Sequence, residues 1–243
     1  MFTLFKKEVN NFLNSLIGFI VIIVFLLING LFLWVLPTDS NILEYGYAGL
    51  EGLFLIAPFV FLFLISAITM RSFADEKKSG TIEILLTKPL TDLQIIFAKF
   101  FASVVLVAVS LLPTFVYFYS VYHIGLPIGN IDMGGTWGSY IGLLLLGASF
   151  SAIGLFSSSI TDNQIISFII SVFLCGTIYI GFELIYSLEL FGKFDLFIKS
   201  LGISHHYSSI SRGVIDTRDL IYYLSIISIF ILLTKLSLQS RKW

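Results

Sequence analysis

The chain has 243 residues and a formal net charge of −1, and 57% of its residues are hydrophobic whereas 12% are charged. A mean hydropathy of +0.98 lies far outside the range of soluble domains and indicates an integral membrane protein. The small net charge argues against a nucleic-acid partner, which would require a basic surface to offset phosphate charge.

The N-terminal stretch 1–16 mixes apolar residues with Lys6, Lys7, Glu8 and asparagines. This mixture is typical of a helix lying on the membrane surface, and we expect an elbow helix before the first span. A secretory signal peptide is the competing interpretation. However, the uncharged run 16–36 has 21 residues, and no small-x-small cleavage site follows it. At about 1.5 Å per residue the run is longer than an ordinary signal segment, so it is predicted to remain as a span.

Six apolar runs are near the length of about 20 residues that crosses the hydrocarbon core. They cover residues 16–36, 53–70, 100–122, 141–160, 165–182 and 220–238. Because lipid tolerates no unpaired backbone group, each run is predicted to be a helix. The expected fold is therefore a single all-α membrane domain over residues 1–243, with six transmembrane helices. Pro58 and Pro113 lie inside the second and third runs, where a local bend is tolerated.

The fourth run is rich in small residues at spacings that allow close helix packing. They are Gly147, Ala148, Ser151, Ala152 and Gly154. The pattern alone leaves open whether this contact lies within one chain or between two.

Segment 71–99 is a long polar stretch between the second and third predicted spans, and its apolar and polar residues follow a helical pattern. Thr81 is suited to cap a short helix that places Ile82, Leu85 and Leu86 on one side, and Glu83 with Thr87 on the other. Pro89 disfavours helical geometry at Lys88, so the helix is expected to end there.

A second helix is predicted to begin directly after this one. Thr91 and Gln94 have the spacing of a capping box, and the new helix leads through Lys99 into the third span. The first, short helix is amphipathic and too short to cross a membrane. An interfacial helix without a partner is one interpretation of it, and a docking element for another protein is the other.

Basic residues are distributed unequally between the two sides of the predicted topology. With the N-terminus inside, ten of the fourteen lie in the cytoplasm and four outside. The inner ones are Lys6, Lys7, Arg71, Lys77, Lys78, Lys88, Lys99, Lys235, Arg241 and Lys242, and the outer ones are Lys193, Lys199, Arg212 and Arg218. This bias predicts that both termini and segment 71–99 are cytoplasmic. Trp34 and Trp137 then lie at the outer ends of their helices, as in an aromatic belt.

The outer segment 183–219 is too apolar for a free loop and too charged to span. Phe191, Phe194 and Phe197 recur every three positions, among them Lys193 and Asp195. One or two short helices in the outer leaflet are expected. Glu183 shares a helix face with Tyr179 and Tyr186, and it is either part of a transport pathway or an acid at headgroup level.

Signals for catalysis or cofactor binding are weak. His123, His205 and His206 have no acidic or cysteine cluster at ligand spacing, and no Gly-x-Ser-x-Gly turn surrounds the nearby serines. A phosphate-binding G-x-x-x-x-G-K-[ST] sequence is absent, so any ATP must be bound by another polypeptide. Cys175 lies inside an apolar run and is expected to be a packing residue.

The sequence from Glu76 through Gly80, Thr81 and Glu83 to Pro89, Leu90 and Thr91, followed by Lys99, resembles the cytoplasmic signature of type-2 ABC exporter permeases. In that family this segment is a coupling helix that sits in a cleft of the ATP-binding subunit. The resemblance assigns this role to Gly80, Thr81, Ile82, Glu83, Leu85, Leu86, Pro89 and Leu90.

The same resemblance implies a permease subunit of the bacterial inner membrane, paired with a second permease and with ATP-binding subunits that hold ATP and Mg²⁺. It identifies no cofactor in this chain, and the likeness is greatest to permeases linked to gliding motility. It leaves Tyr179, Glu183, Pro113, Gly147 and Ser151 as candidates for the transport pathway or the subunit interface. A membrane anchor that recruits a cytoplasmic partner without transport is the alternative function.

Overall fold

The computed structural model describes residues 1–86, 90–190 and 192–240, with the backbone alone for Ile17, Tyr45, Ile84, Leu85, Leu86 and Lys193. Within these ranges all regular structure is helical. The predictions made for Thr87, Lys88, Pro89, Phe191, Arg241 and Lys242 lie outside the described residues.

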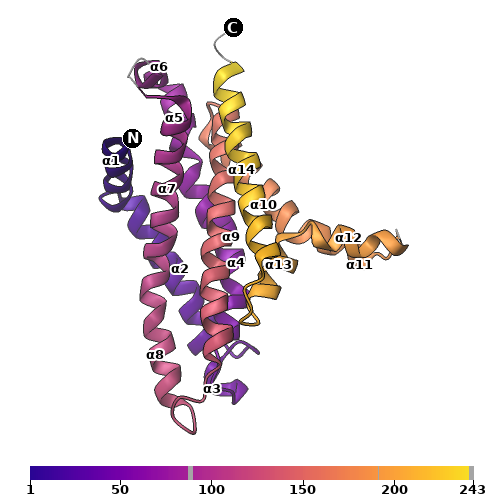
Figure 1. Ribbon diagram of the computed structural model, residues 1–243. Helices are drawn as coiled ribbons and strands as arrows, with labels where there is room; N and C mark the ends of the chain where they lie inside the picture. The colour runs from indigo at the N-terminus through magenta and orange to yellow at the C-terminus, as the bar shows by residue number, and fades with distance from the viewer. Residues whose placement is uncertain (87–89, 191, 241–243) are drawn as a thin grey trace.

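The first half of the chain contains α1 (Phe2–Leu13), α2 (Leu16–Trp34), α3 (Ile42–Tyr45), α4 (Glu51–Thr69), α5 (Arg71–Lys78), α6 (Thr81–Leu86), α7 (Asp92–Leu111), the 3₁₀ turn η1 (Leu112–Thr114) and α8 (Phe115–Ile124). The second half contains α9 (Met133–Ile160), α10 (Gln164–Gly176), the π-helical turn η2 (Thr177–Gly181), α11 (Phe182–Ser187), the 3₁₀ turn η3 (Gly192–Phe194), α12 (Asp195–Ser200), α13 (Ile203–Ile210) and α14 (Thr217–Gln239). Figure 1 shows them as one elongated bundle.

In the part of the chain that the structure describes, five continuous helical segments are long and apolar enough to cross a membrane. They are Glu51–Lys78, Asp92–Ile124, Met133–Ile160, Gln164–Ser187 and Thr217–Gln239, and α1 with α2, bent by 58°, makes a sixth if the pair counts as one span. Five of the six predicted runs fall inside these segments. The run 16–36 extends two residues beyond α2, because Pro37 disfavours helical geometry at Leu36.

The two prolines inside predicted spans have different effects. α4 continues through Pro58 without interruption. Pro113, in contrast, lies in the 3₁₀ turn that separates α7 from α8. A local change of helix type is a common way to accommodate the missing N–H of proline. The third span therefore changes helix type at Pro113 but stays one continuous helical segment, whereas the second is α-helical through Pro58.

α9 is the central helix of the bundle, and α4, α7, α10 and α14 all pack against it. It buries 72% of its most apolar stretch, compared with 22% for Gln164–Ser187 and 28% for α14. The small residues of α9 allow this packing. A Cβ atom at Gly147 would lie 2.6 Å from Val107 of α7, and one at Gly154 would lie 2.0 Å from Thr69 of α4. The small residues of the fourth predicted run, Gly147 and Gly154, therefore pack against helices of the same chain.

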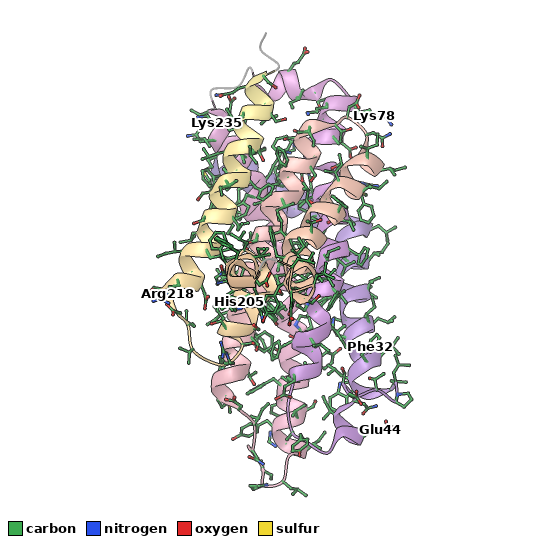
Figure 2. The ribbon with its side chains drawn as sticks, turned by 90° about the vertical axis from the view of Figure 1, so that its right-hand side faces the viewer. Phe32, Glu44, Lys78, His205, Arg218 and Lys235 are labelled. Atoms are coloured by element: carbon green, nitrogen blue, oxygen red, sulfur yellow. The ribbon has the colours of Figure 1, made fainter. Side chains whose placement is uncertain are left out.

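The two ends of the bundle differ in the elements they carry. Figure 1 shows α5, α6 and the C-terminal end of α14 at one end, with α1 beside them, whereas α3 and the end of α8 lie at the other end. Lys78 and Lys235 lie at the first end and Glu44 at the second (Figure 2). Between them, the α11–α12 hairpin projects sideways from the bundle. The short helices predicted between the last two spans are present as α12 and α13.

The close packing of α9 on α4 predicts that Gly154→Ala destabilises the protein by about 1–3 kcal/mol, because the added methyl group would overlap the Thr69 side chain. Thermal unfolding of the purified protein in detergent measures the change. Gly176→Ala is the matched control, because its nearest neighbour would be at an ordinary 3.7 Å and alanine favours the helix. Equal unfolding temperatures for Gly154→Ala and the native chain would contradict this packing.

Candidate coupling site

The turn between α5 and α6 depends on a glycine. The amide of Ser79 donates to the Asp75 carbonyl and that of Gly80 to the Lys77 carbonyl, which completes the last turn of α5. Gly80 then adopts a φ of +68°, the left-handed conformation that commonly ends a helix. Because a Cβ atom there would meet nothing within 4 Å, the requirement for glycine comes from backbone conformation and not from space.

The helix α6 begins differently from the prediction, whereas α7 begins as predicted. Thr81 is the first residue of α6 instead of its cap, and its hydroxyl bonds with the Ser79 hydroxyl at 2.9 Å and faces the Glu76 carbonyl. At α7, the Thr91 hydroxyl accepts from the Gln94 amide and the Gln94 side chain accepts from the Thr91 amide. The predicted capping box is therefore confirmed.

The two sides of α6 have unequal exposure. Ile82 is 8% exposed and belongs to the main apolar core of this chain, whereas Glu83 is exposed. Ile82 therefore positions α6 on its own bundle and is not free to enter a partner's cleft, which differs from the expectation that the apolar side would dock elsewhere. Leu90 is half-buried against the same core. The side chains of Leu85 and Leu86, like Pro89, lie outside the description.

A buried ion triad connects α1, α5 and α7 beneath this turn. The Lys99 ammonium of α7 lies 2.7 Å from Glu76 Oε1 of α5 and 3.3 Å from Glu8 Oε1 of α1. The Lys99 side chain is 3% exposed, and its Nζ also lies 5.3 Å from the centre of the Phe73 ring. A charge this deeply buried is tolerated only where opposite charges and hydrogen bonds compensate for lost hydration. The triad therefore fixes the positions of three helices relative to one another.

A second set of contacts attaches α5 to the end of α9. The Ser158 hydroxyl accepts from the amides of Phe73 and Ala74 at 2.9 and 3.0 Å, and it donates to the Met70 carbonyl at 2.9 Å. Lys77 donates to the Ser159 carbonyl, and Gln164 of α10 donates to Asp75. Since α5 is held on both sides, it forms a rigid support for α6.

The sequence motif included Glu76 and Lys99. It did not indicate that Glu8 pairs with Lys99, or that Ser158 bonds to α5. Glu8 could have been singled out, because it is the acidic residue of a predicted membrane-surface helix and follows two lysines. Ser158 had no such signal, because serines occur throughout α9 and nothing local distinguishes Ser158 from the others. Both residues were missed because their contacts cross 91 and 84 to 88 positions of sequence.

The other predicted residues lie elsewhere in the bundle. Tyr179 and Glu183 line a cavity between α4, α9 and α13, far along the chain from α6. Gly147 and Ser151 are buried residues of α9, and Pro113 lies in the 3₁₀ turn of the third span. The structure therefore separates the candidate coupling residues from the candidate pathway residues.

Besides the triad, His206 makes a buried polar contact, which joins α13 to α14. Its Nδ1 lies 2.7 Å from Asp219 Oδ1 and its Nε2 lies 2.8 Å from the Ser200 carbonyl. Because both partners are acceptor oxygens, either the imidazole carries two protons or Asp219 carries one. The ring also stacks on Tyr222 at 3.8 Å. In the described ranges no three His, Cys, Asp or Glu side chains are grouped so as to hold a metal ion.

Comparison with protein families gives a match over the middle of the chain. The model described as "ABC-2 family transporter protein" matches residues 35–202, which is more than half of the chain. The chain belongs to the ABC-2 transporter family. No curated protein matches it.

Membership in the ABC-2 family defines the general role of the chain. Membrane domains of this family are permeases that lack an ATP-binding site and work with ATP-binding subunits. The chain is therefore a multi-pass ABC-2 membrane permease and not itself the ATPase. The family match begins before α4 and ends within the α12–α13 turn, so it includes the triad residues of α5 and α7 but not Glu8.

The triad predicts that Lys99→Met destabilises this ABC-2 permease by about 3–5 kcal/mol, because two carboxylates would remain close together without a counter-charge. Thermal unfolding in detergent checks the loss. The matched control is Lys78→Met, which removes an exposed lysine from the same end of the bundle and is expected to change stability by less than about 0.5 kcal/mol. Similar losses in both variants would contradict a special role for the triad.

Proposed function

We propose that this chain is the membrane-spanning subunit of an ATP-driven exporter and that α5 and α6 transmit motion between it and a separate ATP-binding subunit. The strongest observation in favour of this proposal is the way in which α5 is fixed and carries α6. The triad and Ser158 hold α5 from two sides, and α5 presents α6 with Glu83 exposed at the end of the bundle. A mechanical connection requires such a rigid support, whereas a helix that merely lies among headgroups does not.

The proposed topology has six spans, with α1 as an elbow and α2 as the first span. Lys78 and Lys235 lie at the end that carries α6 (Figure 2), in agreement with the excess of basic residues predicted for the cytoplasmic side. On this topology both termini are cytoplasmic, the membrane is the bacterial inner membrane, and residues 1–243 form a single permease domain. α12 and α13 then belong to the outer half of the bilayer.

The proposed assembly contains two permease subunits and two ATP-binding subunits, which bind ATP and Mg²⁺. The helix α10 supports a contact with a second permease or with lipid, since Ile165, Ile169 and Phe173 lie along one stripe and are 59 to 70% exposed. The link to gliding motility rests on the sequence resemblance alone and stays a prediction.

The coupling role predicts that Glu83→Ala weakens binding of the ATP-binding subunit about ten- to a hundredfold. A hydrogen bond to a charged group contributes about 1.5–3 kcal/mol, and loss of the exposed carboxylate removes it without disturbing the core. Co-purification from detergent measures binding, and ATP hydrolysis in reconstituted vesicles measures coupling. The amount of permease in the membrane is expected to stay unchanged.

Glu44→Ala is the matched control for this experiment, since Glu44 is also exposed but lies at the opposite end of the bundle (Figure 2). It is expected to bind and stimulate the ATP-binding subunit as the native chain does. If Glu83→Ala also retains full binding and full stimulated hydrolysis, α6 is not the coupling element. If binding is lost in Glu83→Ala but the native complex moves no cargo in the presence of ATP, the chain is an anchor and not a transporter.

A further inference from the structure

A cavity of about 480 Å³ opens between α4, the start of α9, the π-helical turn η2 and α13. This volume is within the range of about 300–1,000 Å³ that small-molecule sites occupy. One wall is apolar and is formed by Phe54, Leu55, Phe59 and Ile180. In Figure 2, His205, which lines the cavity, lies near the middle of the bundle, where the α11–α12 hairpin points toward the viewer. The cavity therefore lies far from the α6 end.

Two hydroxyl groups that line this cavity have no hydrogen-bond partner within the described part of the chain. Tyr179 is 7% exposed and Ser139 is 3% exposed, and in the described part of the chain neither hydroxyl makes a hydrogen bond. Ser103 and Ser110 of α7 donate to a carbonyl of their own helix, whereas Ser139 does not. Because these two hydroxyl oxygens lie at the cavity and have no partner among the described residues, they are free to accept hydrogen bonds from a bound molecule.

The charges around the cavity are predominantly negative. Glu51, Asp132 and Glu183 line it, and none of the three forms an ion pair within the described ranges. Lys199 contributes a positive charge, but its ammonium lies 4.7 Å from the centre of the Tyr186 ring. Burial, together with the nearby His206 and Lys199, lowers the pKa of His205, which keeps that ring neutral at pH 7. Such a field concentrates cations.

We propose that this cavity binds a cationic amphiphile with a primary ammonium head. The ammonium group lies between the carboxylates of Glu51 and Glu183 and donates to the hydroxyls of Tyr179 and Ser139, while the hydrocarbon chain lies along Leu55 and Phe59. An ammonium group supplies three donors and no acceptor, which matches a site of carboxylates and unpaired hydroxyl oxygens. As a site for transported cargo this inference rests on the function proposed above; as a binding site it does not.

Radiolabelled dodecylammonium is the probe, bound to the permease alone in phosphatidylcholine nanodiscs at pH 7 without nucleotide. Empty nanodiscs give the background from partitioning into lipid. Glu183→Gln is expected to weaken binding about tenfold, because it removes the charge and keeps the shape. Tyr179→Phe is expected to weaken binding about threefold or more, because it removes the unpaired hydroxyl and keeps the ring contacts with Phe59 and Phe150.

Glu44→Gln is the matched control, because it removes an exposed acid outside the cavity, and it is expected to bind dodecylammonium as the native chain does. Competition by unlabelled dodecylammonium but not by dodecyl sulfate is also expected. Native binding by both Glu183→Gln and Tyr179→Phe, an equal loss in Glu44→Gln, or equal competition by dodecyl sulfate would each overturn the proposal.

Nanodiscs that contain phosphatidylethanolamine distinguish the source of the ligand. Competition from that lipid assigns the cavity to a lipid headgroup, and absence of competition assigns it to a free amphiphile.

Because no ATP-binding subunit is present, failure of this experiment leaves the coupling function untouched. Failure of the coupling experiment likewise leaves dodecylammonium binding as a property of the permease.

Discussion

The buried ammonium group of Lys99 is the constraint on which the α6 end of this molecule depends. Removal of a lysine from water is strongly unfavourable unless acids accompany it, and here Glu76 and Glu8 do so from two other helices. Because each partner comes from a different element, separation of α1, α5 or α7 would leave a charge uncompensated. Movement of one of these helices must therefore be shared by the other two, and α6 follows α5.

The central helix α9 complements this triad by close packing and by hydrogen bonds. Its glycines allow α4 and α7 to approach closely, and its buried Ser158 holds the first turn of α5 through backbone hydrogen bonds. α9 thus connects α5, which supports α6, with the helices that line the cavity near Tyr179. The region around α13 is held separately, where His206 links α13 to α14 through Asp219. Buried polar contacts thus join helices at both places.

The spans were predictable from sequence because lipid requires apolar side chains and internally bonded backbone over a fixed length, so runs such as 141–160 mark their helices directly. Local chemistry also identified the capping box at Thr91. The long-range pairings were not predictable, since nothing local connects Glu8 with Lys99 or Ser158 with Phe73. The sequence also placed Ile82 on a docking surface, although the bundle itself buries this side chain, because periodicity identifies an apolar face without showing what covers it.

A photoreactive benzoylphenylalanine at position 83, compared with one at position 44 in the same cells, tests the coupling account most directly. Irradiation is expected to join position 83 to an ATP-binding cassette protein identifiable by mass spectrometry, and position 44 is expected to give no such product. Products at position 83 that contain lipid or this chain alone, or the same ATP-binding protein captured equally from position 44, would contradict the account.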